Sequence, residues 1–192
     1  EVAGRDAGGE VAQRRAFAQV GVRLAEQAHQ PRRILPDYGR NEPDLPVYKM
    51  PHLQGWTLAG ATYALPAVGL HQVLWADAAT GRETGRTEVA GQPVFVTARP
   101  DGRELWVNFA TPDNGTVQVI DALTQQVKHR LEPGKGILHM EYTPRGREVW
   151  LSARDDNKVV ILDARTYQKL GEIPAQAPSG IFFTARAHRT GL

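Results

Sequence analysis

The sequence predicts an all-β protein built from β-propeller blades, and two observations carry that prediction. First, Pro100–Trp106 (PDGRELW) returns 44 positions later as Pro144–Trp150 (PRGREVW). Second, Val73–Thr80 matches Val117–Thr124 at the same offset, and a third copy follows at Val159–Thr166. Repeats of roughly 40 to 45 residues made of short strands are typical of propeller blades, and each blade needs neighbours to cover its faces.

One repeat unit reads as four strands separated by turns. The expected strands cover 94–98, 105–109, 117–120 and 126–130. The first turn contains Asp101-Gly102 and the second Asn114-Gly115, which accept the positive φ values of tight turns, whereas the β-branched residues between them suit a pleated sheet. An Asp-Ala-x-Thr step at Asp121 precedes the outer strand, and its Asp and Thr side chains can satisfy backbone donors of the turn.

The repeat does not account for a whole ring. The phased region from about residue 47 supplies three units and the first strand of another, whereas closed propellers need roughly 4 to 8 blades. Segment 180–186 aligns 44 positions after 136–142, which predicts a further innermost strand. We therefore expect a partial propeller domain over 33–192. Residues 1–32 stay unassigned, with a possible amphipathic helix at 11–29.

Composition excludes several classes of protein. The 23 basic residues are scattered among 21 acidic ones without a basic stripe, which argues against a nucleic-acid partner. No apolar run approaches the ~18 residues of a membrane span. There is no cysteine, so neither disulfides nor a Cys-x-x-Cys-His heme c motif is expected, and either cytoplasm or periplasm is compatible. No zinc-like ligand spacing or nucleotide-binding glycine loop is present, so neither zinc nor a nucleotide is expected.

Five stretches between Arg32 and Leu192 carry a family resemblance. They are Arg33–Gly39, Leu45–Trp56, Leu65–Gly69, Leu138–Gly146 and Ala177–Phe183. These stretches resemble the d1 domain of cytochrome cd1 nitrite reductases and, more closely, the NirF-type proteins of heme d1 biosynthesis. The resemblance implies an eight-bladed cytochrome d1-like propeller with a d1-type tetrapyrrole at its central mouth, of which this chain matches the C-terminal half. The repeat unit also resembles YVTN-type propellers, which indicates fold and not chemistry.

His139 is the first candidate site residue, because it lies in the middle of an expected innermost strand, which lines the channel of a propeller. A neutral imidazole can ligate heme iron or exchange a proton near pH 7. A core histidine hydrogen-bonded to a backbone carbonyl is the alternative. The family resemblance favours His139 as a catalytic acid or base, or as an axial iron ligand.

A second group of candidates lies near residue 50. Lys49, His52 and Trp56 bring a cation, an imidazole and an aromatic ring to one expected first strand, where they could meet the carboxylates and the face of a macrocycle. The alternative is that Lys49 is a solvated surface charge and Trp56 packs within its blade.

Four further residues are candidates from the family pattern. Cytochrome cd1 nitrite reductases have a Pro-Glu-Tyr step and a Thr-Gly near the end, the latter helping to hold the heme; here the sequence reads Met140-Glu141-Tyr142 and Ser179-Gly180. Ser179 and Gly180 could approach a ligand carboxylate closely, or form an ordinary loop. Glu141 and Tyr142 could position or protonate a side chain, or simply satisfy the strand.

The resemblance implies a heme d1 biosynthesis protein that binds heme d1 or a late precursor and promotes modification of a side chain, for nitrite reductase in denitrification. Other heme d1 maturation proteins or nitrite reductase itself are then expected partners. The alternative is a non-enzymatic YVTN-like repeat propeller that acts as a protein-interaction scaffold, for which apolar loop tips would be expected. Three blades also leave two broad faces uncovered, which predicts self-association, for example as a dimer.

Overall fold

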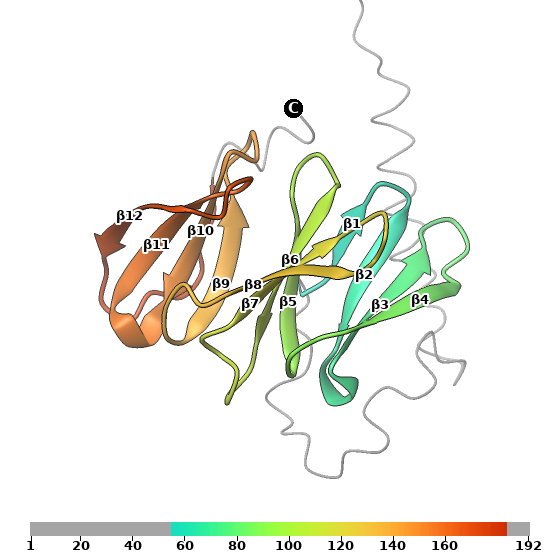
Figure 1. Cartoon of the computed structure of the whole chain (residues 1–192), viewed down its shortest axis with the longest axis horizontal. Coiled ribbons are helices and arrows are strands. Elements are labelled where there is room, and N and C mark those ends of the chain that lie inside the picture. The colour runs from blue at the N-terminus through green and yellow to red at the C-terminus, as the bar shows by residue number, and fades with distance from the viewer. Residues whose placement is uncertain (1–54, 184–192) are drawn as a thin grey trace, which may run out of the picture.

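The computed structural model describes residues 55–183, which form three four-stranded antiparallel sheets (Figure 1). Blade 1 contains β1 (Thr57–Ala59), β2 (Thr62–Ala67), β3 (Gln72–Asp77) and β4 (Glu83–Glu88). Blade 2 contains β5 (Pro93–Ala98), β6 (Glu104–Phe109), β7 (Val117–Asp121) and β8 (Val127–Leu131). Blade 3 contains β9 (Ile137–Tyr142), β10 (Glu148–Ala153), β11 (Lys158–Asp163) and β12 (Lys169–Pro174). The predicted all-β fold of consecutive propeller blades is confirmed.

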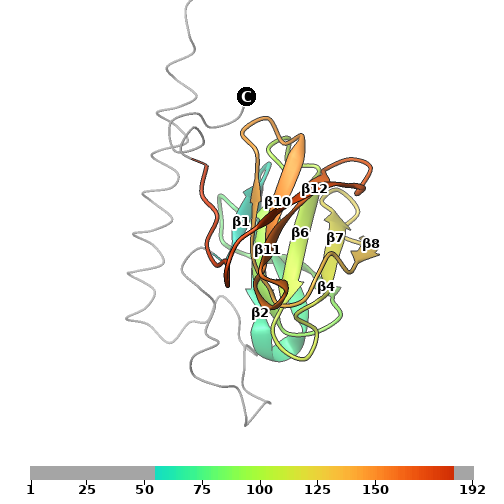
Figure 2. The same cartoon turned by 90° about the vertical axis from the view of Figure 1, so that its left-hand side faces the viewer.

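The strands of each blade lie side by side in chain order. Figure 2 shows β1, the first strand of blade 1, on the left and β8, the outer strand of blade 2, on the right. The chain after β12 runs on the same side as β1. Two 3-10 turns join second and third strands: η2 (Val68–Leu70) in blade 1 and η3 (Arg154–Asp156) in blade 3. Within residues 55–183, no helix is long and apolar enough to cross a membrane.

The core lies between the blades, and β6 shows why. All six of its residues are buried, because the middle blade is covered on both faces. Val107 belongs to a cluster with Trp75 of blade 1, whereas Trp106 belongs to a cluster with Tyr142 of blade 3. Side chains that alternate along a strand point to opposite faces, so one strand supplies both interfaces. Burial of these apolar side chains is the main favourable term that holds neighbouring blades together.

The Asp-x-x-Thr steps of the repeat form the turns that the sequence predicts. In each blade the Asp Oδ1 accepts a hydrogen bond from the backbone N–H of the threonine three positions later, at 2.7, 2.9 and 2.7 Å. Hydrogen bonds from the threonine lower the pKa of the aspartate below its usual value in each blade. The largest cause is the Thr80 hydroxyl, followed by its backbone N–H, at Asp77, and it is the backbone N–H of the threonine at Asp121 and Asp163. The carboxylate satisfies backbone donors that the turn cannot pair internally.

Two expectations about strands are corrected. Residues 180–183 do not form the predicted innermost strand; the backbone N–H of Ile181 donates to the His139 side chain instead of to a neighbouring strand. A strand is defined by its ladder partner, and sequence periodicity does not report whether that partner is there. Trp56 lies just before β1 and not within it. Lys49, His52, the helix expected at 11–29 and the boundary at 32/33 lie outside the described residues and stay predictions.

Candidate functional site

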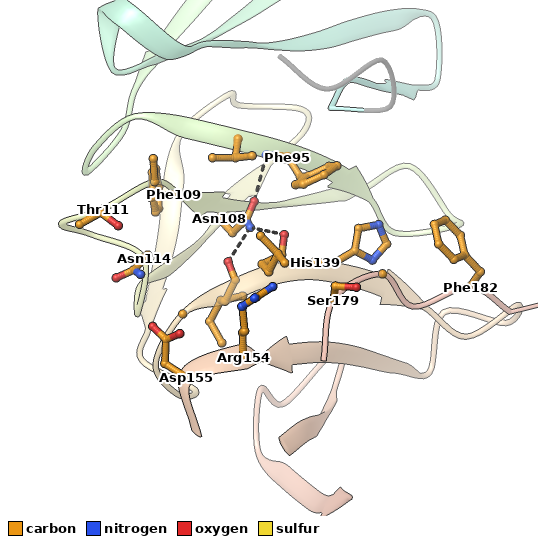
Figure 3. A pocket seen from close by; sticks show the side chains of 16 residues that line it. Phe95, Asn108, Phe109, Thr111, Asn114, His139, Arg154, Asp155, Ser179 and Phe182 are labelled. Atoms are coloured by element: carbon orange, nitrogen blue, oxygen red, sulfur yellow. Dashed lines mark hydrogen bonds between the residues drawn. The ribbon is translucent and has the colours of Figure 1, made fainter. Parts of the chain in front are cut away.

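A pocket of about 550 Å³ opens between the innermost strands of blades 2 and 3 (Figure 3). Strands β5 and β9 form its walls, the loops after β6 and β10 form its rim, and segment 179–182 lies along one side. Its apolar lining comes from Val94, Phe95, Phe109, Ala110, Ile137, Leu138 and Phe182. Its polar lining comes from Asn108, Thr111, Asn114, His139, Arg154, Asp155 and Ser179. Apolar walls with a few polar groups are typical of small-molecule sites.

Asn108 ties the two blades together behind the pocket. Its side chain is 1% exposed. Its Oδ1 accepts from the backbone N–H of Phe95 at 2.9 Å, and its Nδ2 donates to the carbonyls of Ile137 at 2.8 Å and Leu138 at 3.2 Å. The register of β5 on β6 shifts between Pro93 and Phe95, so the Phe95 N–H needs a partner outside the regular ladder. Asn108 supplies that partner.

Ser152 holds the equivalent position in blade 3, 44 residues after Asn108. Its Oγ accepts from the backbone N–H of His139 at 2.9 Å and donates to the His139 carbonyl at 3.3 Å. Sequence reasoning missed both residues. The available signal was a polar side chain at the same place in two otherwise apolar strands, since a buried polar group requires a hydrogen-bond partner.

His139 lines the pocket from β9. Its ring lies between Phe95 and Phe182, with centroid distances of 5.2 and 5.3 Å. Its Nδ1 accepts a hydrogen bond from the backbone N–H of Ile181 at 3.2 Å. A backbone N–H can only donate, so Nδ1 carries no proton, and the neutral ring carries its proton on Nε2.

The tautomer with the proton on Nε2 determines which chemistry His139 can perform in this conformation. Nε2–H can donate a hydrogen bond to a ligand oxygen. Coordination of iron by Nε2 would require the proton to move to Nδ1, and the hydrogen bond from Ile181 would then be lost. The geometry therefore favours a proton donor over an axial iron ligand.

The rim carries one positive and one negative side chain from η3. The backbone N–H groups of Arg154 and Asp155 donate to the carbonyls of Gly136 at 3.0 Å and Lys135 at 3.2 Å, which fixes this turn against the start of β9. Gly136 has a φ of 64°, and a Cβ there would lie 2.5 Å from Asp155 Oδ2. Glycine suits position 136 because this φ lies in the left-handed region, which residues with a Cβ rarely adopt.

The predicted site residues divide into two groups. Ser179 and Gly180 line the pocket together with His139. Tyr142 does not line it: its side chain is fully buried on the other face of β9, with its ring 6.1 Å from that of Trp106, and burial raises its pKa well above the usual value. Three positions separate Tyr142 from His139, so the two point to opposite faces of the strand.

Glu141 and Trp56 also lie outside the pocket lining. Glu141 is 9% exposed within β9. Trp56 packs edge-on against Tyr63, with centroids 5.4 Å apart. Over residues 55–183, no group of three or more His, Asp or Glu side chains is placed to hold a metal ion.

Comparison with known proteins relates this geometry to one family. The family model described as cytochrome D1 heme domain matches residues 11–187. Protein NirF of Stutzerimonas stutzeri is 52% identical over 179 residues, which are 92% of this chain and 46% of that protein. Protein NirF of Pseudomonas aeruginosa is 54% identical over 161 residues, 84% of this chain and 41% of that protein. The chain thus spans less than half the length of these relatives.

A solved structure agrees with the blade arrangement. Dihydro-heme d1 dehydrogenase NirN in complex with DHE superimposes with a TM-score of 0.60 and 25% identity, over 71% of this chain and 31% of that chain. The resemblance to cytochrome d1 domains and NirF-type proteins drawn from five stretches of sequence is confirmed.

Proposed function

Because this chain belongs to the cytochrome D1 heme domain family, we propose that it is a heme d1 biosynthesis protein that binds a late tetrapyrrole precursor and promotes modification of one of its side chains. The two NirF relatives, at 52% and 54% identity, support this pathway. The name of NirN, a dihydro-heme d1 dehydrogenase, supports a d1-type tetrapyrrole as the ligand. The product would serve nitrite reductase, with that enzyme or other maturation proteins as partners.

The observation that carries the proposal is the pocket at the inner strands, with His139 between two aromatic rings. A volume of about 550 Å³ suits the edge and one arm of a macrocycle, while the remaining surface would rest on residues outside the pocket. Phe95 and Phe182 offer apolar contact to the ring edge. His139 Nε2–H and the Ser179 hydroxyl offer hydrogen bonds to a peripheral oxygen.

In this function His139 holds or moves a proton at a peripheral side chain of the substrate. Neutral His139 polarises an oxygen through Nε2–H. A second proton on Nδ1 would face the N–H of Ile181, so proton uptake is coupled to movement of segment 179–183. Ser179 and Gly180 orient the substrate beside His139, and we extend the same orienting role to Lys49 and His52.

The proposal is tested by titrating the full chain with heme d1 and with its dihydro precursor while recording the visible absorption spectrum. A saturable shift is expected with one or both. His139→Ala should abolish conversion of the precursor, whereas His129→Ala on the outer strand β8 is the matched control and should leave it unchanged. No saturable shift with either compound would overturn the proposal.

A further inference from the structure

Arg154 combines two features: it lines the pocket, and the structure gives it no ion pair among the residues that it describes. Arg99 pairs with Glu104 at 2.9 Å, and Arg86 pairs with Glu83 at 2.6 Å. An arginine without a carboxylate partner, at the rim of an apolar pocket, is available to a ligand anion.

The turn that carries Arg154 does not require arginine. Blade 1 has the same kind of turn, η2, which begins at Val68 and ends with a left-handed residue at His71 (φ 51°). In blade 3 the turn begins at Arg154 and ends with left-handed Asn157 (φ 53°). Because the equivalent turn begins with valine, the backbone of this turn does not require an arginine at position 154. The Arg154 side chain can therefore have a role other than forming the turn.

The two charges of η3 point to different parts of the pocket. Figure 3 shows the Arg154 side chain directed toward the middle of the pocket, whereas the Asp155 side chain lies on the side of Asn114. The carboxylate of Asp155 is placed over Gly136, as the close approach to a Cβ there shows. A ligand anion in the centre would therefore meet the guanidinium first, and Asp155 would weaken its binding through repulsion.

From this placement we propose that Arg154 is the counter-ion for a carboxylate arm of the bound macrocycle, and that the pocket between β5 and β9 seats this arm. The guanidinium forms paired hydrogen bonds with the carboxylate oxygens. His139 Nε2–H and the Ser179 hydroxyl complete the polar surroundings, and Phe95 contacts the apolar edge to which the arm is attached. The inference rests on the proposed function and adds one residue and one chemical group to it.

The test compares heme d1 with the same heme carrying its carboxylates as methyl esters, each titrated into the full chain. Arg154→Gln should weaken binding of the free acid by about ten- to a hundredfold, the range for a charge-assisted hydrogen bond, and leave binding of the ester within about twofold. Arg145→Gln is the matched control, because Arg145 is an exposed arginine in the loop between β9 and β10. It should change neither affinity.

Asp155→Asn supplies a variant with the opposite expected sign. Removal of this negative charge should strengthen binding of the free acid by a few fold and leave binding of the ester unchanged. A variant that merely damaged the fold would not bind more tightly, so the pair of opposite effects supports a carboxylate in the pocket.

Three outcomes would overturn the inference, and they separate it from the proposed function. If the unaltered chain bound neither form of the heme, both proposals would fail. If the chain bound heme d1 and Arg154→Gln bound it equally well, the carboxylate subsite would fail and the proposed function would stand. If Arg154→Gln weakened the acid and the ester alike, Arg154 would act through the fold and not as a counter-ion.

Discussion

His139 occupies a repeat position that holds phenylalanine in the neighbouring units, Phe95 at 44 residues before and Phe183 at 44 residues after. Because phenylalanine occupies the equivalent position in the adjacent repeat units, packing at this position does not require histidine. The hydrogen bonds to the His139 backbone from Ser152 also do not depend on the side chain. Under the proposed function, we therefore expect the imidazole to matter for the chemistry more than for the packing of this strand.

His139→Phe should accordingly keep the fold and lose the chemistry. We expect a melting temperature within a few degrees of the unaltered chain, because the ring still lies between Phe95 and Phe182, together with loss of precursor conversion. Thermal unfolding followed by circular dichroism and a conversion assay measure the two effects. A large fall in melting temperature would show that the imidazole has a structural role.

Asn108→Ala should destabilise the chain by about 3 kcal/mol, because it leaves the Phe95 N–H and two carbonyls without their side-chain partner. Urea unfolding gives the free energy of unfolding. Asn114→Ala, at the pocket rim, is the control and should cost less than about 1 kcal/mol. Equal costs would mean that the buried amide is not what joins the two blades.

Among the elements, β6 also contacts its neighbours through one buried carboxylate. Glu104 is 6% exposed and accepts from Arg99 at 2.9 Å, Lys128 at 2.7 Å and the Tyr167 hydroxyl of blade 3 at 3.0 Å. Glu104→Gln should cost about 3 kcal/mol in urea unfolding, because Arg99 would keep its charge in a poorly solvated place. The exposed partner Asp101, changed to Asn, should cost under about 1 kcal/mol. The reverse order would contradict this assignment.

The turn aspartates predict a loss of stability in acid. Their pKa values are lower in the folded chain than the ordinary value of 3.8, so the folded state binds fewer protons than the unfolded state. Their contribution is fully present above about pH 4 and disappears as the pH falls through the folded values. Urea unfolding between pH 6 and pH 2 measures it, and the triple Asp→Asn variant should show a weaker pH dependence. An unchanged slope would exclude these carboxylates as the cause.

Sequence predicts this fold at the level of elements because turn chemistry is local. The strand at 94–98 and the turn at Asp121 follow from residues that are neighbours in the chain. His139, Ser179 and Gly180, which the sequence marks through an inner strand and the family pattern, line one pocket in the structure, and their role in a site stays a prediction. The pocket itself is different.

The sequence signals Asn108 only as a polar residue in an apolar strand; its hydrogen bonds to the carbonyls of Ile137 and Leu138 depend on the packing of blade 2 against blade 3, which no local pattern reports. Tyr142 lies outside the pocket lining because its ring packs against Trp106 across the interface, on the other face of β9. The packing of one blade against the next depends on side chains that are far apart in the sequence. Local sequence patterns therefore do not predict which residues meet between the blades.

At the scale of the whole molecule, blade 3 repeats on its outer face the surface that blade 2 buries. Trp106 and Val119 are fully buried against blade 3, whereas their equivalents Trp150 and Ile161 are only half-buried. An apolar face of this kind favours association with another blade.

Ile161→Lys should reduce self-association of the chain, because it places a charge in the middle of that face. Sedimentation at several protein concentrations measures the change in apparent mass. Leu123→Lys is the matched control: Leu123 is 93% exposed at a turn and lies outside this face. If both variants associate like the unaltered chain, the outer face of blade 3 is not the contact surface.

The hydrogen bonds of Asn108 also bear on how a ligand reaches the pocket. They join backbone atoms of β5 and β9, so the two walls move as one body and cannot part like the halves of a clamp. Access is then through the rim, past Arg154 and segment 179–182. Ligand binding is then expected to be a one-step bimolecular reaction. Its observed rate constant should rise in proportion to the ligand concentration, whereas a slow hinge movement before binding would make that rate constant level off.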